Sequence, residues 1–201
     1  MKLQKIMPIL ASSAIKTIDM KIFAETDRII MRELLLSDSQ KMFEMDSDPE
    51  VHLYLGNKPY TQLSESEENI RFIRQQYEEN GIGRWAVIDK ESNEFVGWGG
   101  LKFITTEINN RVHFYEVGYR FLKQHWGKGY ATASAKAALK YAFEELKLSH
   151  VYAMAHGENA GSRHALQKSG LKITEQFDHE GIACDWFEIS KEDWLKKQNE
   201  E

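Results

Sequence analysis

The sequence predicts a single α/β domain, built on a mixed, mostly antiparallel sheet that is flanked by helices. The chain of 201 residues is 42% hydrophobic and 28% charged, which is enough apolar material for one buried core. Short β-branched runs with alternating apolar residues are interspersed with runs of helical spacing. The order of these runs departs from the strict alternation of a doubly wound parallel sheet, so most neighbouring strands should be antiparallel.

The first third of the chain predicts one strand and two helices. Residues 28–34 alternate and are β-branched, which is typical of a strand. A short helix follows and stops before Pro49, since proline does not continue a helix. A longer helix should begin at a capping box formed by Ser64 and Glu67 and end at Gly81.

The middle of the chain predicts three strands and one long helix. The strands are expected at residues 85–88, 95–103 and 112–122. Residues 129–146 have alanines and leucines on one face and charged residues on the other, which indicates an amphipathic helix.

The last part of the chain continues the same alternation of element types. A buried strand is expected at residues 151–155, and a short helix over residues 159–169 should stop at Gly170. Two strands follow, at residues 172–177 and 183–189. A terminal turn is expected near residues 192–196.

Composition excludes several classes of protein. The 26 basic and 31 acidic residues give a net charge of −5, and no basic run interleaves with aromatics, so we expect no nucleic-acid partner. Cys184 is the single cysteine, which excludes an intrachain disulfide and a cysteine-based metal site. No apolar stretch approaches the ~20 residues that span a bilayer, so we expect no membrane segment.

The N-terminal segment has two interpretations. Lys2 and Lys5 precede a short apolar run, as in a signal peptide, but the run contains Pro8 and stops at Lys16. We therefore expect residues 1–20 to form a flexible extension ahead of a domain over residues 21–201, and a cytoplasmic protein.

The segment with the clearest chemistry is the junction between the strand at 112–122 and the helix that follows. Gly127 and Gly129 lie in the turn, and a small Ala131 follows at the helix start. A helix N-terminus leaves backbone N–H groups unpaired and carries roughly half a positive charge, so this junction predicts an anion site. Two glycines in a tight turn are also the ordinary explanation of such a segment.

Two other phosphate motifs do not fit this junction. Thr132 stands where the dinucleotide fingerprint needs its third glycine. The P-loop needs a serine or threonine after its lysine, but Lys128 is followed by Gly129. The junction therefore belongs to neither class.

Residues 124–129 (QHWGKG) resemble the Gln/Arg-x-x-Gly-x-Gly/Ala signature of the GNAT superfamily of N-acetyltransferases. The flanking EVGY and YAT segments look like its ribosomal-protein, or Rim-type, branch. Further matches at residues 48–55, 85–88, 96–97, 159–162 and 168–171 fall in the family's order, so the similarity covers about residues 24–195.

The resemblance implies acetyl-CoA as cosubstrate, no metal, and a wedge between the strands at 112–122 and 151–155. The pantetheine arm would lie in the wedge, and backbone N–H groups from about residue 124 to 130 would hold the diphosphate. The cofactor-binding residues it implies are Phe121, Leu122, Gln124, His125, Trp126, Gly127, Lys128, Gly129, Tyr130, Ala131, Asn159 and Ser162. Asn159 is also a favoured helix-cap residue, and the two roles are compatible.

The implied reaction is direct attack of a primary amine on the thioester through a tetrahedral intermediate. The amine would be a protein N-terminal α-amine or a small-molecule amine, and an N–H near residues 120–122 would stabilise the oxygen. Glu116 is the candidate general base, although Arg120 on the same strand face makes an ordinary ion-paired residue an equal alternative.

One position departs from the family pattern. Many members carry a tyrosine seven residues after the asparagine as general acid, and here Leu166 stands there. Ser162, Tyr130 or water could replace it, or the thiolate could leave without an acid. The departure motivates an alternative function, a non-catalytic acyl-CoA-binding module on the same fold. We leave open whether the protein uses another acyl-CoA, whether it forms a homodimer and which amine it accepts.

Overall fold

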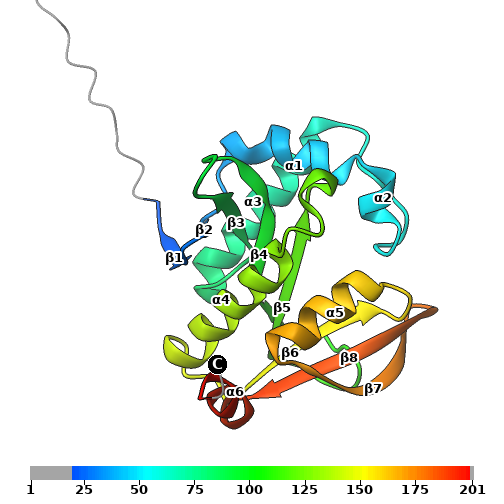
Figure 1. Ribbon diagram of the computed structural model, residues 1–201. Coiled ribbons are helices and arrows are strands. Elements are labelled where there is room, and N and C mark those ends of the chain that lie inside the picture. The colour runs from blue at the N-terminus through cyan, green and yellow to red at the C-terminus, as the bar shows by residue number, and fades with distance from the viewer. Residues whose placement is uncertain (1–19, 200–201) are drawn as a thin grey trace, which may run out of the picture.

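The computed structural model describes residues 20–199, in which helices cover both faces of one eight-stranded sheet (Figure 1). The strands are β1 (Ile22–Glu25), β2 (Ile29–Arg32), β3 (Trp85–Asp89), β4 (Phe95–Ile104), β5 (Phe114–Phe121), β6 (His150–His156), β7 (Lys172–His179) and β8 (Ile182–Ser190). The helices are α1 (Ser39–Asp46), α2 (Pro49–His52), α3 (Leu63–Asn80), α4 (Tyr130–Glu144), α5 (Ala160–Ser169) and α6 (Lys191–Gln198), with 3-10 turns η1 (Leu36–Asp38) and η2 (Lys123–His125).

The sheet has the strand order β1-β2-β3-β4-β5-β6-β8-β7. Every neighbouring pair is antiparallel except β5 and β6, which are parallel. Within the described residues β5 and β6 share one registered position, Glu116 opposite Tyr152, whereas β4 and β5 pair along eight. Figure 1 shows β5 and β6 diverging from each other. The predicted mixed, mostly antiparallel sheet is confirmed.

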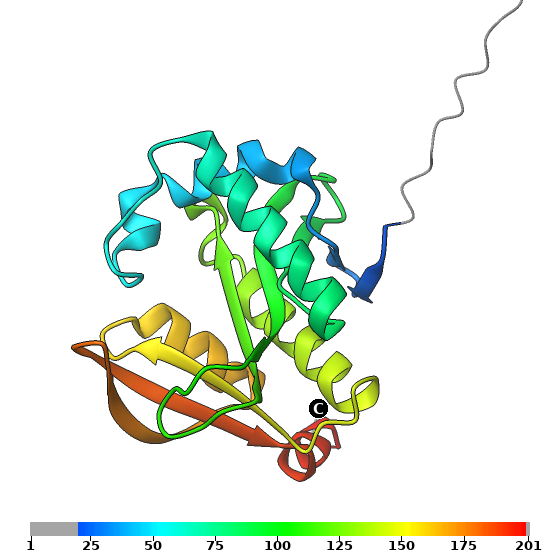
Figure 2. The same cartoon turned by 180° about the vertical axis from the view of Figure 1, so that it is seen from behind.

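Two hydrophobic cores hold the helices on the sheet. Figure 1 shows α4 in front of the sheet, and Figure 2 shows α3 in front of the opposite face. On the α4 side, Ala135, Leu139 and Ala142 recur at helical spacing and are fully buried. On the α3 side, Ile70 and Ile73 are buried against residues from α1 and β3. Burial of each large apolar side chain stabilises this arrangement by about 1.5–3 kcal/mol.

Three element predictions are corrected. The expected capping box at Ser64 and Glu67 is wrong, because α3 begins at Leu63 and Glu65 accepts the backbone N–H of Gln62 at 2.8 Å. The sequence prediction missed β1, since four residues with a single buried side chain give no periodicity. The terminal turn expected near residues 192–196 lies inside α6, which is helical from Lys191 to Gln198.

The flexible extension expected over residues 1–20 lies outside the described residues, save for its last residue. In the part of the chain that is described, no helix has the length and apolar character that crossing a membrane requires.

Candidate active site

The turn between β5 and α4 is shaped by two glycines in left-handed conformation. After the 3-10 turn η2, Gly127 has φ of 73° and Gly129, the N-cap of α4, has φ of 82°. Residues that carry a side chain rarely adopt these backbone angles, which explains why both positions are glycine. A Cβ at Gly127 would meet nothing within 4 Å, so the backbone there faces open space. A ligand can therefore approach this backbone closely.

The amides of this turn divide into two groups. The N–H groups of His125 and Trp126 donate to the carbonyls of Leu122 at 2.9 Å and Lys123 at 3.0 Å. Within residues 20–199, no acceptor receives a hydrogen bond from the N–H groups of residues 127–132, and the first such bond in α4 comes from Ala133. The amide cradle, defined as residues 127–132, therefore leaves out His125 and Trp126 of the predicted range of 124–130 and extends two residues further into α4.

The side chains that were predicted to bind the cofactor differ in their hydrogen bonds and in their exposure around this cradle. The Tyr130 hydroxyl donates to Asp89 at 2.8 Å, which directs it away from β6 and argues against a role as the acid. The Trp126 indole donates to the Phe121 carbonyl at 2.8 Å and closes the end of β5. Gln124 and Lys128 are exposed. Ala131 is half-buried against the α4-side core, so its small side chain keeps the helix start close to the sheet.

Only every second backbone N–H of β5 points into the wedge, which is the space between the diverging strands β5 and β6. The N–H of Leu122 donates to Val96 on β4 at 3.1 Å, so Leu122 is not available to a ligand in the wedge. Because N–H directions alternate along a strand, those of Phe121 and Tyr119 point toward β6. Of the amides at residues 120–122, where an oxyanion donor was expected, only that of Phe121 therefore points toward β6, and that of Tyr119 lies one alternation earlier.

A tyrosine that sequence analysis did not single out bridges the wedge. The Tyr119 hydroxyl donates to the Ser162 carbonyl of α5 at 3.0 Å and lies 3.4 Å from its Oγ. Burial raises the pKa of Tyr119 to about 12. Asn159 caps α5 by accepting the Ser162 N–H at 3.0 Å, so its capping role is present. Leu166 is buried in the core. Only the alternation along β5 could have indicated Tyr119.

Glu116 lies at the base of the wedge and forms an ion pair. Its carboxylate is held by the Arg84 guanidinium, which also donates to the carbonyls of Gly100 at 2.7 Å and Glu116 at 2.8 Å. A Cβ at Gly118 would stand 2.7 Å from Arg84 Nη2, so Gly118 leaves room for this guanidinium. Glu116 is therefore ion-paired, and its partner is Arg84 rather than Arg120, which pairs with Asp46.

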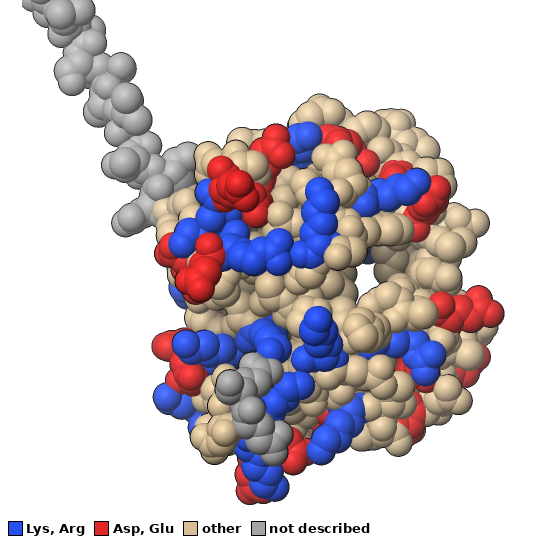
Figure 3. Space-filling view, viewed as in Figure 1, with Lys and Arg blue, Asp and Glu red and all other residues tan. Residues whose placement is uncertain are grey.

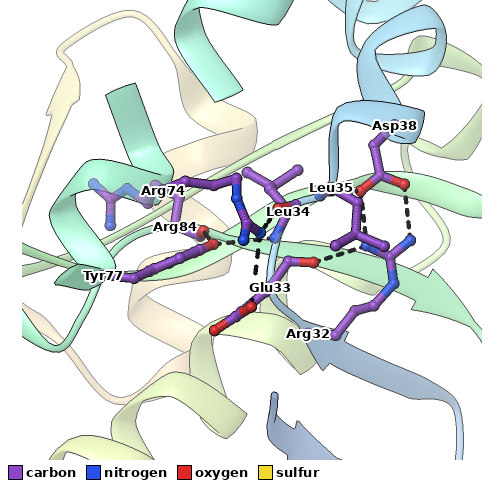
Figure 4. A network of polar contacts seen from close by, with 8 residues as sticks. All are labelled: Arg32, Glu33, Leu34, Leu35, Asp38, Arg74, Tyr77 and Arg84. Atoms are coloured by element: carbon purple, nitrogen blue, oxygen red, sulfur yellow. Dashed lines mark hydrogen bonds and ion pairs between the residues drawn. The ribbon is translucent and has the colours of Figure 1, made fainter. Parts of the chain in front are cut away.

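Arg84 is fixed by a polar network between β2, η1 and α3. The Tyr77 hydroxyl donates to the Arg84 carbonyl and accepts the Leu34 N–H at 3.2 Å (Figure 4). Arg74 donates to the Leu34 carbonyl at 2.8 Å. Figure 4 shows the Tyr77 and Arg74 side chains pointing toward the backbone of Leu34, just after the end of β2. The network holds the backbone of Arg84, from which the guanidinium reaches Glu116.

Arg120 has a different partner, which lies at the end of α1. Its Nη1 donates to Asp46 Oδ1 at 2.6 Å, and Asp46 is completely buried at the end of α1. His52 Nε2 of α2 lies 3.7 Å from the same oxygen. Burial, aided by the charge of Arg120 and opposed by Asp46, lowers the pKa of His52. This buried cluster joins α1 and α2 to β5.

The wedge opens between α2 and α5. Figure 3 shows the surface hollowed between the parts that cover these two helices. Tyr54, just after α2, and His156, at the end of β6, approach with ring centroids 5.0 Å apart. The site therefore has an amide cradle at one side, diverging strands in the middle and a polar cluster above.

These features fit an acyl-CoA ligand. The free N–H groups suit a diphosphate, and the diverging strands provide an unpaired edge for an extended arm. The fold and site together define the class of acyl-CoA-dependent transferases. Residues 28–172 match the family model described as "Acetyltransferase (GNAT) domain", and the chain belongs to this family. It is an acetyl-CoA-dependent N-acetyltransferase.

Relatives and solved structures agree with this assignment. The uncharacterized N-acetyltransferase p20 of Bacillus licheniformis is 33% identical over 151 residues, which cover 73% of this chain and 83% of that protein. The FsC-acetyl coenzyme A-N(2)-transacetylase of Aspergillus fumigatus is 30% identical over 169 residues, covering 77% and 70%. Spermidine N-acetyltransferase from Vibrio cholerae, in complex with CoA and spermine, shares the fold with a TM-score of 0.67 at 21% identity, covering 85% and 99%.

Proposed function

We propose that the protein acetylates a primary amine, either a protein N-terminal α-amine or the amine of a small molecule. The observation that supports this proposal most is the amide cradle at residues 127–132, beside strands that share one registered position. Acetyl-CoA supplies the acetyl group as an activated thioester. The cradle residues would hold the diphosphate, and the Phe121 and Tyr119 amides would face the arm and the thioester oxygen. Asn159 and Ser162 would line the opposite wall.

Glu116 is the proposed general base. Its position opposite Tyr152 places it where the wedge begins, and Arg84 keeps its carboxylate in place. An amine must lose a proton to attack, and an α-amine with a pKa of about 8 does so more easily at neutral pH than lysine at about 10.4. Because a guanidinium already holds the carboxylate, proton transfer through a water molecule suits this geometry better than direct contact.

The charges above the sheet favour an acceptor with a single amine. The carboxylates of Glu116 and Asp46 are each paired with an arginine, and Lys102 stands opposite Glu116 in register. Burial and the charge of Arg84 lower the pKa of Lys102. Because both carboxylates are already paired, neither offers a free negative charge to the second amine of a polyamine. Similarity to the ribosomal-protein branch points in the same direction, toward an α-amine.

Thiol release from acetyl-CoA tests the proposal across a panel of N-terminal peptides, small monoamines and polyamines. We expect acceptor-dependent release with members of the first two groups. Absence of release above background with every acceptor would contradict the proposal.

Glu116→Gln tests the proposed base with the best acceptor. We expect kcat/KM to fall by roughly 100-fold, because general-base catalysis contributes about that factor or more. Glu188→Gln is the matched control, since this glutamate lies on β8 opposite Tyr152 and should keep its activity within about twofold. Unchanged turnover in Glu116→Gln, with the fold intact, would remove Glu116 from the mechanism.

A further inference from the structure

Arg28 lies at the back of the amide cradle, although it precedes the cradle by 100 residues in the chain. Its Nη1 donates to the Lys128 carbonyl at 3.0 Å, and its guanidinium carbon lies 5.0 Å from the centroid of the Tyr130 ring. We propose that Arg28 is a positioning residue that orients the cradle for the cofactor's diphosphate. This inference rests on the proposed function, because it concerns the same cofactor site.

The first step of the argument is the geometry of one peptide unit. The bond between Lys128 and Gly129 is trans, so the Lys128 carbonyl and the Gly129 N–H point in opposite directions within one plane. Arg28 holds the carbonyl. The Gly129 N–H therefore points away from Arg28, and it is one of the N–H groups that bind no acceptor within residues 20–199. Releasing the carbonyl would let this peptide rotate.

The second step is the attachment of the cradle to the domain. Tyr130 donates its hydroxyl to Asp89 at 2.8 Å, and its ring lies against His125 with centroids 5.8 Å apart. Arg28 covers the same ring, a contact in which the cation is attracted to the aromatic face. Arg28 thus contacts the turn on both sides of Gly129, through the Lys128 backbone and the Tyr130 ring.

The third step is charge. The whole chain carries −5, which opposes a polyanionic cofactor. Arg28 and Lys128 are exposed, and within residues 20–199 neither lies at ion-pair distance from a carboxylate, although Arg28 is close enough to Asp89 to attract its charge. Lys and Arg atoms gather over the region where α4 begins (Figure 3). These two cations add to the positive end of α4, so the local field favours an anion.

Isothermal titration of CoA into the full chain tests the proposal with three variants. We expect Arg28→Ala to raise the Kd about tenfold and Arg28→Lys about threefold, since lysine keeps the charge but not the planar stacking. Arg71→Ala is the control, because Arg71 is an exposed arginine on α3 whose loss changes the net charge equally. It should bind CoA within about twofold of the parent chain.

Two further readouts separate positioning from a general structural defect. With acetyl-CoA, Arg28→Ala should raise KM while kcat stays within about twofold, and turnover of acetyl-pantetheine, which lacks the diphosphate, should not change. The Gly129 amide resonance of the free protein should move in Arg28→Ala and stay in Arg71→Ala. Equal CoA affinity in Arg28→Ala and the parent chain would overturn the inference about Arg28 and leave the proposed function standing. Failure of the parent chain to bind CoA would overturn the proposed function as well.

Discussion

At the scale of single residues, the base of the wedge depends on one missing side chain. Gly118 lies between Glu116 and Arg120 on one face of β5, and the Arg84 guanidinium occupies the space beside it. Arg84 is buried, and its donors serve two carbonyls and one carboxylate. A buried guanidinium is tolerated only while these partners stay in place. Position 118 is therefore glycine because a side chain there would leave no room for the ion pair, and not because the backbone conformation requires glycine.

Gly118→Ala should destabilise the protein by about 1–3 kcal/mol, because the new Cβ would displace the Arg84 guanidinium from its partners. Unfolding in urea measures this change. Gly161→Ala in α5 is the matched control, since its nearest neighbour would be Asn159 Oδ1 at 3.8 Å. The control should be neutral or slightly stabilising, because alanine favours a helix. Equal stability of the two variants would show that Arg84 can move at no cost.

At the scale of elements, α1 and α2 are tied to β5 by a buried polar cluster. Asp46 at the end of α1 accepts from Arg120 on β5, and His52 of α2 lies beside the same carboxylate. Both ring nitrogens of His52 are buried without a hydrogen-bond partner in the described structure. Burial therefore dominates the behaviour of this imidazole, which is held neutral beside two charges.

The lowered pKa of His52 predicts a specific pH dependence of stability. Burial is the largest cause, followed by the Arg120 charge, while Asp46 opposes them. The unfolded chain takes up a proton at about pH 6.5, and the folded protein does so only at lower pH. Stability conferred by the neutral imidazole is therefore present above about pH 6.5 and is lost as the pH falls below it.

His52→Gln should reduce the loss of unfolding free energy between about pH 7 and pH 5.5, measured in urea at each pH. His164→Gln, at an exposed position on α5, is the control and should keep the slope of the parent chain. Identical slopes in all three proteins would mean that His52 titrates alike in both states.

At the scale of the whole molecule, sequence reasoning succeeded where local patterns decide the structure. The turn at residues 127–129 and the helix after it were predictable, because left-handed glycines and a helix N-terminus are local features. The partners of Glu116 and of the Lys128 carbonyl were not predictable from the sequence. Arg84 and Arg28 reach them from 32 and 100 residues away, and only the strand register brings them together. Tyr119 was missed because its role depends on where α5 packs.

The most direct test of the central claim is amide hydrogen exchange, followed by NMR with and without CoA. The amides of His125 and Trp126 are bonded within the protein and should be protected in the free chain, whereas those of residues 127–132 should exchange rapidly. On addition of saturating CoA, we predict that exchange of the 127–132 amides slows by at least about tenfold. Unchanged exchange at these residues, with protection appearing elsewhere, would contradict the account.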